Sequence, residues 1–194
     1  MNKNILEIKN EIDILIKIYK EDINKEINFL NNKFIDNNKS LNESNIELYI
    51  NERLSKYKKY FKPDKEGEYK IKLKYFGNLT DCSYMFADCE NIIKLNFISF
   101  NTYFVKNMKY MFYKCTNLKE INLLSFDTTN VIDISYMFYE CENLLYLDLS
   151  FKNDKLIKNY ISSLFKNLNN LDLYNYFNIE KLGNFEGIFY NLKS

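Results

Sequence analysis

The 194-residue sequence predicts an α/β solenoid with a 26-residue period, in which parallel strands alternate with short helical turns behind a β-rich N-terminal cap. Three features predict it: a repeated Met-Phe-x-x-Cys motif, apolar residues at strand spacing after each motif, and an alternating apolar segment near the N-terminus. The expected division is residues 1–75 for the cap and 76–194 for the repeats, with about four units and a truncated fifth.

The predicted cap begins with a strand over residues 12–18, where isoleucines alternate with the charged residues Glu11, Asp13 and Lys17. A helical heptad from Ile5 to Tyr19 is the alternative, but the prevalence of β-branched residues favours the strand. A repeat stack needs a cover for the apolar end of its first unit, and this segment is placed to supply one. Further short strands are expected near residues 26–30, 45–50 and 68–74.

Each repeat is predicted to open with a short helical turn. The motif phenylalanine falls at Phe86, Phe112 and Phe138, with apolar residues one and four positions before it. Those spacings form one helical face, and a short polar residue such as Asp81 or Asn107 precedes the turn as a cap. After a corner at the cysteine, apolar residues spaced by two indicate a strand. Stacked units would form a parallel sheet with strands about 4.8 Å apart.

Three segments carry a family resemblance: “SYMFADCENIIKLNFISF” (83–100), “KYMFYKCTNLKEINLLSF” (109–126) and “SYMFYECENLLYLDLSF” (135–151). They resemble the BspA-like leucine-rich-repeat family of bacterial and protist surface proteins. The preceding segment resembles the β-rich lead-in of protist members. The resemblance implies a leucine-rich-repeat stack, a protein-binding or adhesive surface and no enzymatic activity. No secretory leader is recognisable, so the expected location is cytoplasmic although the family is often found at the cell surface.

Composition argues against several classes of function. The 27 basic and 26 acidic residues balance, which disfavours a nucleic-acid-coating or polybasic membrane protein. A basic, aromatic run at residues 56–62 could contact phosphates, but acidic residues follow it at once. The sequence has no histidine, which removes the commonest general base and metal ligand. We expect no catalytic residues, metal, cofactor, nucleic-acid partner or membrane insertion.

Two repeated columns admit both a structural and a functional interpretation. Cys89, Cys115 and Cys141 recur with the period, but zinc-binding thiolates use much shorter spacings, so we expect buried free thiols. A disulfide between neighbouring units is geometrically allowed but leaves one thiol over. The tyrosine column that begins at Tyr84 and Tyr110 indicates either ring packing between units or a partner surface.

The open face of the predicted sheet is the candidate binding site. Its outward positions form columns in which apolar side chains lie beside polar ones, as in protein interfaces; the alternative is a strand face that contacts only solvent. Leu124 and Tyr146 are the expected anchors for a protein partner. A second hypothesis is a structural or adhesive piece that self-associates through an open C-terminal repeat. The candidate residues are Lys94, Asn96, Ile98, Glu120, Asn122, Leu124, Tyr146, Asp148, Ser150, Asn170 and Asp172.

Overall fold

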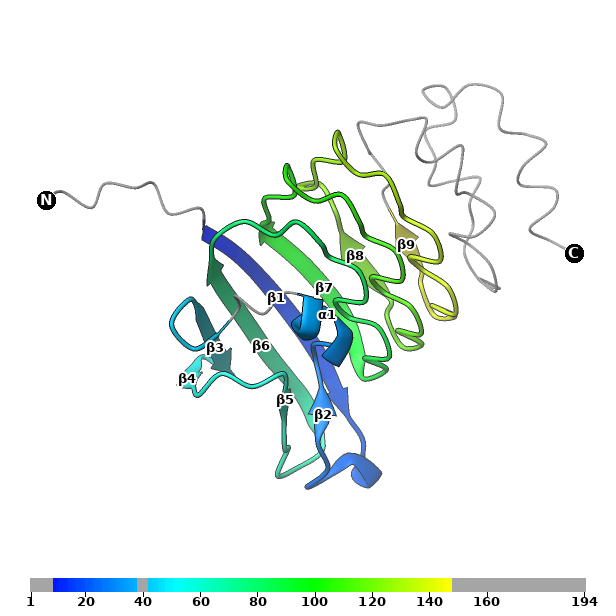
Figure 1. Ribbon diagram of the computed structural model, residues 1–194. Coiled ribbons are helices and arrows are strands. Elements are labelled where there is room, and N and C mark those ends of the chain that lie inside the picture. Colours follow the sequence, from blue (N-terminus) through cyan, green and yellow to red (C-terminus); the bar gives the residue numbers. More distant parts are fainter. Residues whose placement is uncertain (1–8, 38–41, 148–194) are drawn as a thin grey trace, which may run out of the picture.

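The computed structural model describes residues 9–37 and 42–147, and strands are the main elements of this part of the chain (Figure 1). One α-helix, α1 (Asn32–Asn37), and one 3-10 helix, η1 (Lys20–Asp22), accompany them there. The strands in chain order are β1 (Lys9–Ile18), β2 (Ile27–Asn28), β3 (Ile46–Ile50), β4 (Arg53–Ser55), β5 (Tyr60–Phe61), β6 (Gly67–Phe76), β7 (Ile92–Ser99), β8 (Glu120–Asn122) and β9 (Tyr146–Leu147).

Seven of these strands form one mixed sheet, in the order β4-β3-β6-β1-β7-β8-β9. Its first part, β4 to β1, is antiparallel, whereas β7, β8 and β9 pair in parallel and in register. Strand β1 joins the two parts because it pairs antiparallel with β6 on one side and with β7 on the other. The strands β2 and β5 form a separate small sheet. Strands expected near residues 45–50 and 68–74 are confirmed as β3 and β6.

Strand β1 has one fully buried apolar face and one half-buried face. The strand prediction for this segment is confirmed: Ile12, Ile14, Ile16 and Ile18 are all buried, and the residues between them lie half-buried on the other face. The register sets acidic residues of β1 opposite lysines of β6, which favours this pairing. The sheet therefore has a buried inner face and an open outer face along β1.

Two parts of the chain cover the inner face of the sheet: the segment between β1 and β6, and the turns of the repeat units. Phe29 and Phe34 share one apolar core with the inward residues of β1 and β6, and the ring of Phe61 lies 5.1 Å from that of Tyr69 on β6. The turns of the repeat units supply the rest of the cover. Their motif phenylalanines stack with ring centroids 5.7 and 5.2 Å apart: Phe86, Phe112 and Phe138.

The predicted helical turn is absent from the described units, and a chain of tight turns takes its place. In the first unit Tyr84 and Asp88 have left-handed φ values of 61° and 59°, and the equivalent residues of the next two units do the same. Every second N–H in this segment donates to the next unit, as that of Phe86 does to the Met111 carbonyl at 2.8 Å. A helix would direct these N–H groups to its own carbonyls. The turns use them to join neighbouring units.

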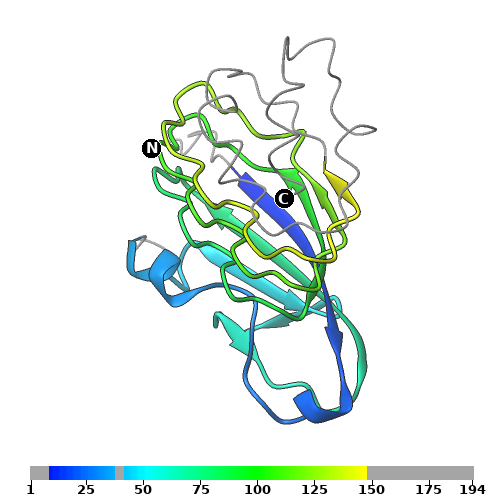
Figure 2. The same ribbon diagram turned by 90° about the vertical axis from the view of Figure 1, so that its right-hand side faces the viewer.

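The prediction of an α/β solenoid is therefore wrong. The described chain is β-rich, its sheet is mixed, and its one α-helix lies outside the repeats. The spacing of apolar residues predicted a helical turn, but a chain of tight turns buries the same inward residues, Cys82, Met85 and Phe86. Figure 2 looks along the stack from the β9 side, where the coils of successive units overlap.

Side chains at the corner of each unit bind it to the unit before. The Cys115 thiol donates to the Phe86 carbonyl at 3.1 Å, and the Asn117 amide donates to the Glu90 carbonyl at 3.0 Å. The equivalent cysteine and asparagine of the next unit repeat both bonds. All four cysteines are buried and free, which confirms the prediction of buried free thiols.

The segment before α1 covers the turn side of the first unit. The backbone N–H of Asn31 donates to the Met85 carbonyl at 3.0 Å, and its side-chain amide donates to the Ala87 carbonyl at 2.9 Å. These two donors take the place of the backbone N–H groups that a preceding unit would supply. The ammonium of Lys33 lies 4.4 Å from the centre of the Tyr84 ring and covers the end of the tyrosine column.

Candidate functional site

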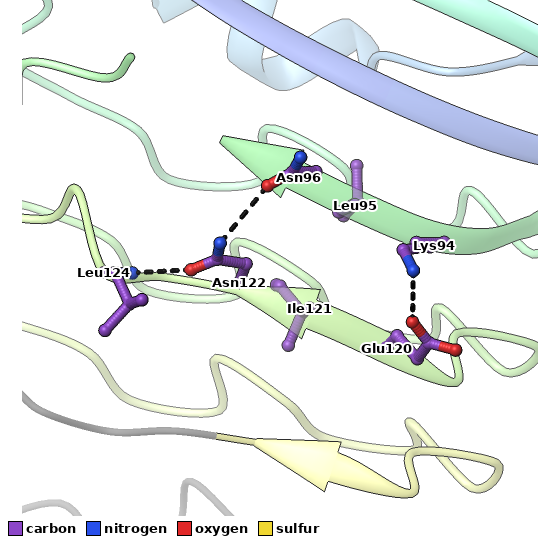
Figure 3. Close-up of a pocket in the computed structure, with 7 residues that line it drawn as sticks. All are labelled: Lys94, Leu95, Asn96, Glu120, Ile121, Asn122 and Leu124. Carbon is purple, nitrogen blue, oxygen red and sulfur yellow. Dashed lines mark hydrogen bonds and ion pairs between the residues drawn. The ribbon is translucent and has the colours of Figure 1, made fainter. Parts of the chain in front are cut away.

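A shallow hollow on the open face of β7 and β8 gathers five of the predicted site residues (Figure 3). Its volume is about 360 Å³. The parallel register places the equivalent positions of successive units side by side on the two strands. The residues that line the hollow are Lys94, Leu95, Asn96, Glu120, Ile121, Asn122 and Leu124.

The polar residues of this hollow are tied to one another across the two strands. Lys94 and Glu120 form an ion pair, and the amide of Asn122 donates to the side-chain oxygen of Asn96 at 3.3 Å. The side-chain oxygen of Asn122 accepts a bond from the backbone N–H of Leu124 at 3.0 Å. These bonds fix the positions of the polar side chains on this face.

Two exposed aliphatic side chains accompany the hollow. Leu124 is 69% exposed, and Ile98, which occupies the same position one unit earlier at the end of β7, is 52% exposed. The backbone of Tyr146 on β9 pairs with that of Glu120 on β8. The remaining predicted site residues lie outside the described residues: Asp148, Ser150, Asn170 and Asp172.

A second and larger hollow, which the sequence reasoning missed, lies on the same open face over the antiparallel part of the sheet. It has a volume of about 660 Å³ and shares Lys94 and Asn96 with the first hollow. The alternation of charged residues marks the outward face of β1 and β6, but nothing local in the sequence shows that β1 pairs with β7. Its other main lining residues are Asp13, Leu15, Tyr49, Glu52, Lys70, Lys72 and Lys74.

Charged side chains in the second hollow have defined partners. The ammonium of Lys72 lies 2.6 Å from Glu11 and 3.3 Å from Asp13, and the hydrogen bond to Glu11 is the main reason that the pKa of Lys72 is raised. The ammonium of Lys74 lies 5.1 Å from the centre of the Tyr49 ring. Among the described residues, no carboxylate forms an ion pair with Lys70. The hollow thus combines charged side chains that have partners with one cation, Lys70, that forms no ion pair with a described carboxylate.

The four cysteine thiols are buried inside the described part of the chain. Burial raises the pKa of each of the four cysteines, which keeps the thiols protonated and disfavours nucleophilic chemistry. Within residues 9–37 and 42–147 no group of three His, Cys, Asp or Glu side chains could hold a metal ion. Over the same ranges no helix has the length and apolar character of a membrane span.

The tyrosine column packs ring on ring. Tyr84, Tyr110 and Tyr136 stack with centroids 5.0 and 5.1 Å apart, and the rings of Tyr113 and Tyr139 form a second stack at 5.2 Å. Each ring in both stacks is half-buried. The ring-packing interpretation of this column is thus confirmed, because the ring faces are occupied by neighbouring units.

Comparison with known proteins corrects the family assignment made from the repeat motif. The family model that matches is described as “Mycoplasma protein of unknown function, DUF285”, over residues 28–145 and again over residues 80–194. This match gives no support to a leucine-rich-repeat family, to a protist origin or to a surface protein, so that assignment is wrong. No curated protein and no solved structure matches the chain. Because the matched residues cover well over half of the sequence, the chain belongs to the DUF285 family of Mycoplasma proteins of unknown function.

Proposed function

We propose that this protein is a non-catalytic interaction module that binds a protein partner through the open face of its mixed sheet. The observation that carries the proposal is the combination of exposed aliphatic side chains with fixed polar neighbours. Leu124 lies next to the hydrogen-bonded Asn122, and Ile98 holds the equivalent position one unit earlier, while the Lys94–Glu120 ion pair lies at the other end of the hollow. An apolar centre with a satisfied polar surround is typical of protein interfaces.

The extent of the open face also supports a macromolecular partner. The two hollows share residues of β7, so the surface runs from β3 across to β8 without a break between them. Both are open depressions over strands. Such a surface suits contact with another folded chain or an extended segment.

The proposal is tested with a double variant, Ile98→Ser and Leu124→Ser, in affinity capture from the source cells followed by quantitative mass spectrometry. Ile132→Ser is the matched control, because Ile132 is 68% exposed but lies outside both hollows. Proteins captured by the wild type and by the control should be lost from the double variant. Circular dichroism checks that all three proteins are folded.

The proposal would be overturned if every protein captured by the wild type were retained by the double variant, or if the control lost the same proteins. Light scattering of the purified protein distinguishes binding of a different protein from self-association. A monomer at high micromolar concentration is the expected result, and a dimer abolished by the double variant would assign this face to a second copy of the chain.

A further inference from the structure

Strand β4 forms the outer edge of the antiparallel part of the sheet (Figure 1). Among the described strands it pairs with β3 alone, and the register sets Leu54 opposite Tyr49. The side of β4 that faces away from β3 is therefore bonded to no described strand. An outer strand of this kind presents backbone N–H and C=O groups to which another extended chain can bond.

The bonds of the neighbouring strand show which backbone groups of β4 point outward. Asn51, which follows β3, donates its N–H to the Lys70 carbonyl of β6 at 2.8 Å. Backbone groups alternate in direction along a strand, so Tyr49 also bonds towards β6, and its neighbours Leu48 and Ile50 bond towards β4. Leu54, opposite Tyr49, therefore directs its N–H and C=O away from the sheet. Within the described part of the chain, neither group has a hydrogen-bond partner.

The side chains of β4 are also open to a partner. Leu54 is 70% exposed, and because residues opposite each other share a face, it lies on the open face beside Tyr49. Arg53 is exposed on the other face, and no described carboxylate forms an ion pair with it. Two consecutive residues thus offer an apolar side chain, a cation and one free pair of backbone groups.

The small size of this edge favours a partner that also contacts the open face. A second copy of β4 is a poor occupant, because two strands of three residues bury far less than the roughly 1,200 Å² of a stable interface. Glu52, which precedes β4, lines the second hollow, so the edge is continuous with the open face. A protein held on that face reaches β4 without a separate binding event.

We infer that the protein partner adds an extended segment antiparallel to β4, with an apolar residue opposite Leu54 and an acidic residue opposite Arg53. This inference rests on the proposed function and names the form of the partner's contact. The apolar residue exchanges both backbone bonds with Leu54, which supplies affinity, and the side chains supply specificity. Because the two chains run in opposite directions, the acidic residue directly follows the apolar one.

The inference is tested by fluorescence anisotropy with a labelled nine-residue peptide that has leucine at its fifth position, glutamate at its sixth and threonine elsewhere. N-methylation of the fifth residue removes the N–H that bonds to the Leu54 carbonyl and should weaken binding at least about tenfold. N-methylation of the fourth residue is the matched control. Its N–H points away from β4, so the affinity should stay within about twofold of that of the parent peptide.

Variants of the protein test the same contact from the other side. Leu54→Pro removes the outward N–H and keeps the bonds to β3, since proline is tolerated on an edge strand, and it should weaken binding at least about tenfold. The wild type should prefer the glutamate peptide to one with lysine at the sixth position, and Arg53→Glu should reverse this preference. Lys106→Glu, an exposed position on the repeat units, should change nothing. Circular dichroism checks that each variant is folded.

Equal weakening by the two N-methylations, full binding by Leu54→Pro, or the same peptide preference in Arg53→Glu as in the wild type would overturn the inference. So would a dimer in light scattering that Leu54→Pro abolishes, because the edge would then belong to a second copy. The Ile98→Ser and Leu124→Ser double variant should still bind the peptide. If that variant loses its captured partners while the peptide never binds, the inference fails and the proposed function stands.

Discussion

At the scale of single residues, asparagine side chains form hydrogen bonds that connect separate segments of this protein. Asn10 is fully buried on β1, where its amide donates to the Gly77 carbonyl at 3.0 Å and its oxygen accepts the N–H of Asn101 at 2.8 Å. Asn117 bonds its unit to the preceding one. The amide group suits these places because it both donates and accepts without adding charge.

The buried thiols predict a loss of stability at alkaline pH. Their pKa values are raised in the folded state, so the folded protein keeps protons that the unfolded chain releases above about pH 8.5. The stabilising contribution is complete below that pH and declines as the pH rises. Each thiol should steepen the fall in unfolding free energy by about 1.4 kcal/mol per pH unit.

Urea unfolding between about pH 8 and pH 10 measures this effect. The Cys115→Ala variant should show a slope smaller than that of the wild type by the contribution of one thiol, whatever its stability at neutral pH. Equal slopes for the two proteins would show that this thiol does not control the alkaline transition.

The turn between β3 and β4 predicts a stabilising substitution. Asn51 and Glu52 have φ values of 48° and 67°, the signature of a two-residue hairpin turn that prefers Asn-Gly. A glutamate in the left-handed region costs about 1 kcal/mol. Glu52→Gly should therefore raise the unfolding free energy by about that amount in a urea titration.

Glu68→Gly is the contrasting control, because Glu68 is an exposed residue within β6. Glycine there should lower the stability by up to about 1 kcal/mol. If Glu52→Gly were as destabilising as this control, the turn would not be strained as described.

At the scale of elements, the cover over the first unit depends on few bonds. Asn31 caps α1 by accepting the N–H of Lys33 at 2.8 Å, and it also donates to two carbonyls of the first repeat unit. Asn31→Ala removes its side-chain bonds and leaves the Ala87 carbonyl without this donor. We expect a loss of about 2 kcal/mol in urea unfolding, against less than about 0.5 kcal/mol for Asn28→Ala, an exposed position on β2. Equal losses in both variants would show that this cover is not specific.

Elements were predictable where the pattern has one structural solution. The alternation over residues 12–18 allows a half-buried strand, and β1 is found there. The spacing of Cys82, Met85 and Phe86 has two solutions, because a helix and a chain of turns both bury these residues. The choice between them is made by N–H bonds to the next unit, which periodicity within one unit does not reveal.

At the scale of the whole molecule, the site was predictable only in its repeated half. Lys94 and Glu120 were placed on one face because equivalent positions of adjacent units must lie side by side. The other half of the open face depends on β1 pairing with both β6 and β7, which brings together residues as far apart in the sequence as Glu11 and Ser99. Such long-range pairing is set by tertiary packing and leaves no local signal.

Because the sheet is continuous, we expect the predicted cap (residues 1–75) and the predicted repeats (from residue 76) to unfold together. Ile14 is buried on the strand that joins the two parts. Ile14→Ala should cost about 2–4 kcal/mol and lower amide protection in β6 and β7 alike, as measured by hydrogen exchange. Two separate unfolding transitions, with protection lost in only one part, would indicate independent domains.

The most direct test of the central claim is hydrogen exchange of the protein with and without a partner captured by the wild type. Binding at the open face should slow exchange in β1, β7 and β8 and leave the turns around Tyr110 and Tyr136 unchanged. Slower exchange confined to those turns, with β7 and β8 unaffected, would contradict the claim that the sheet face is the binding surface.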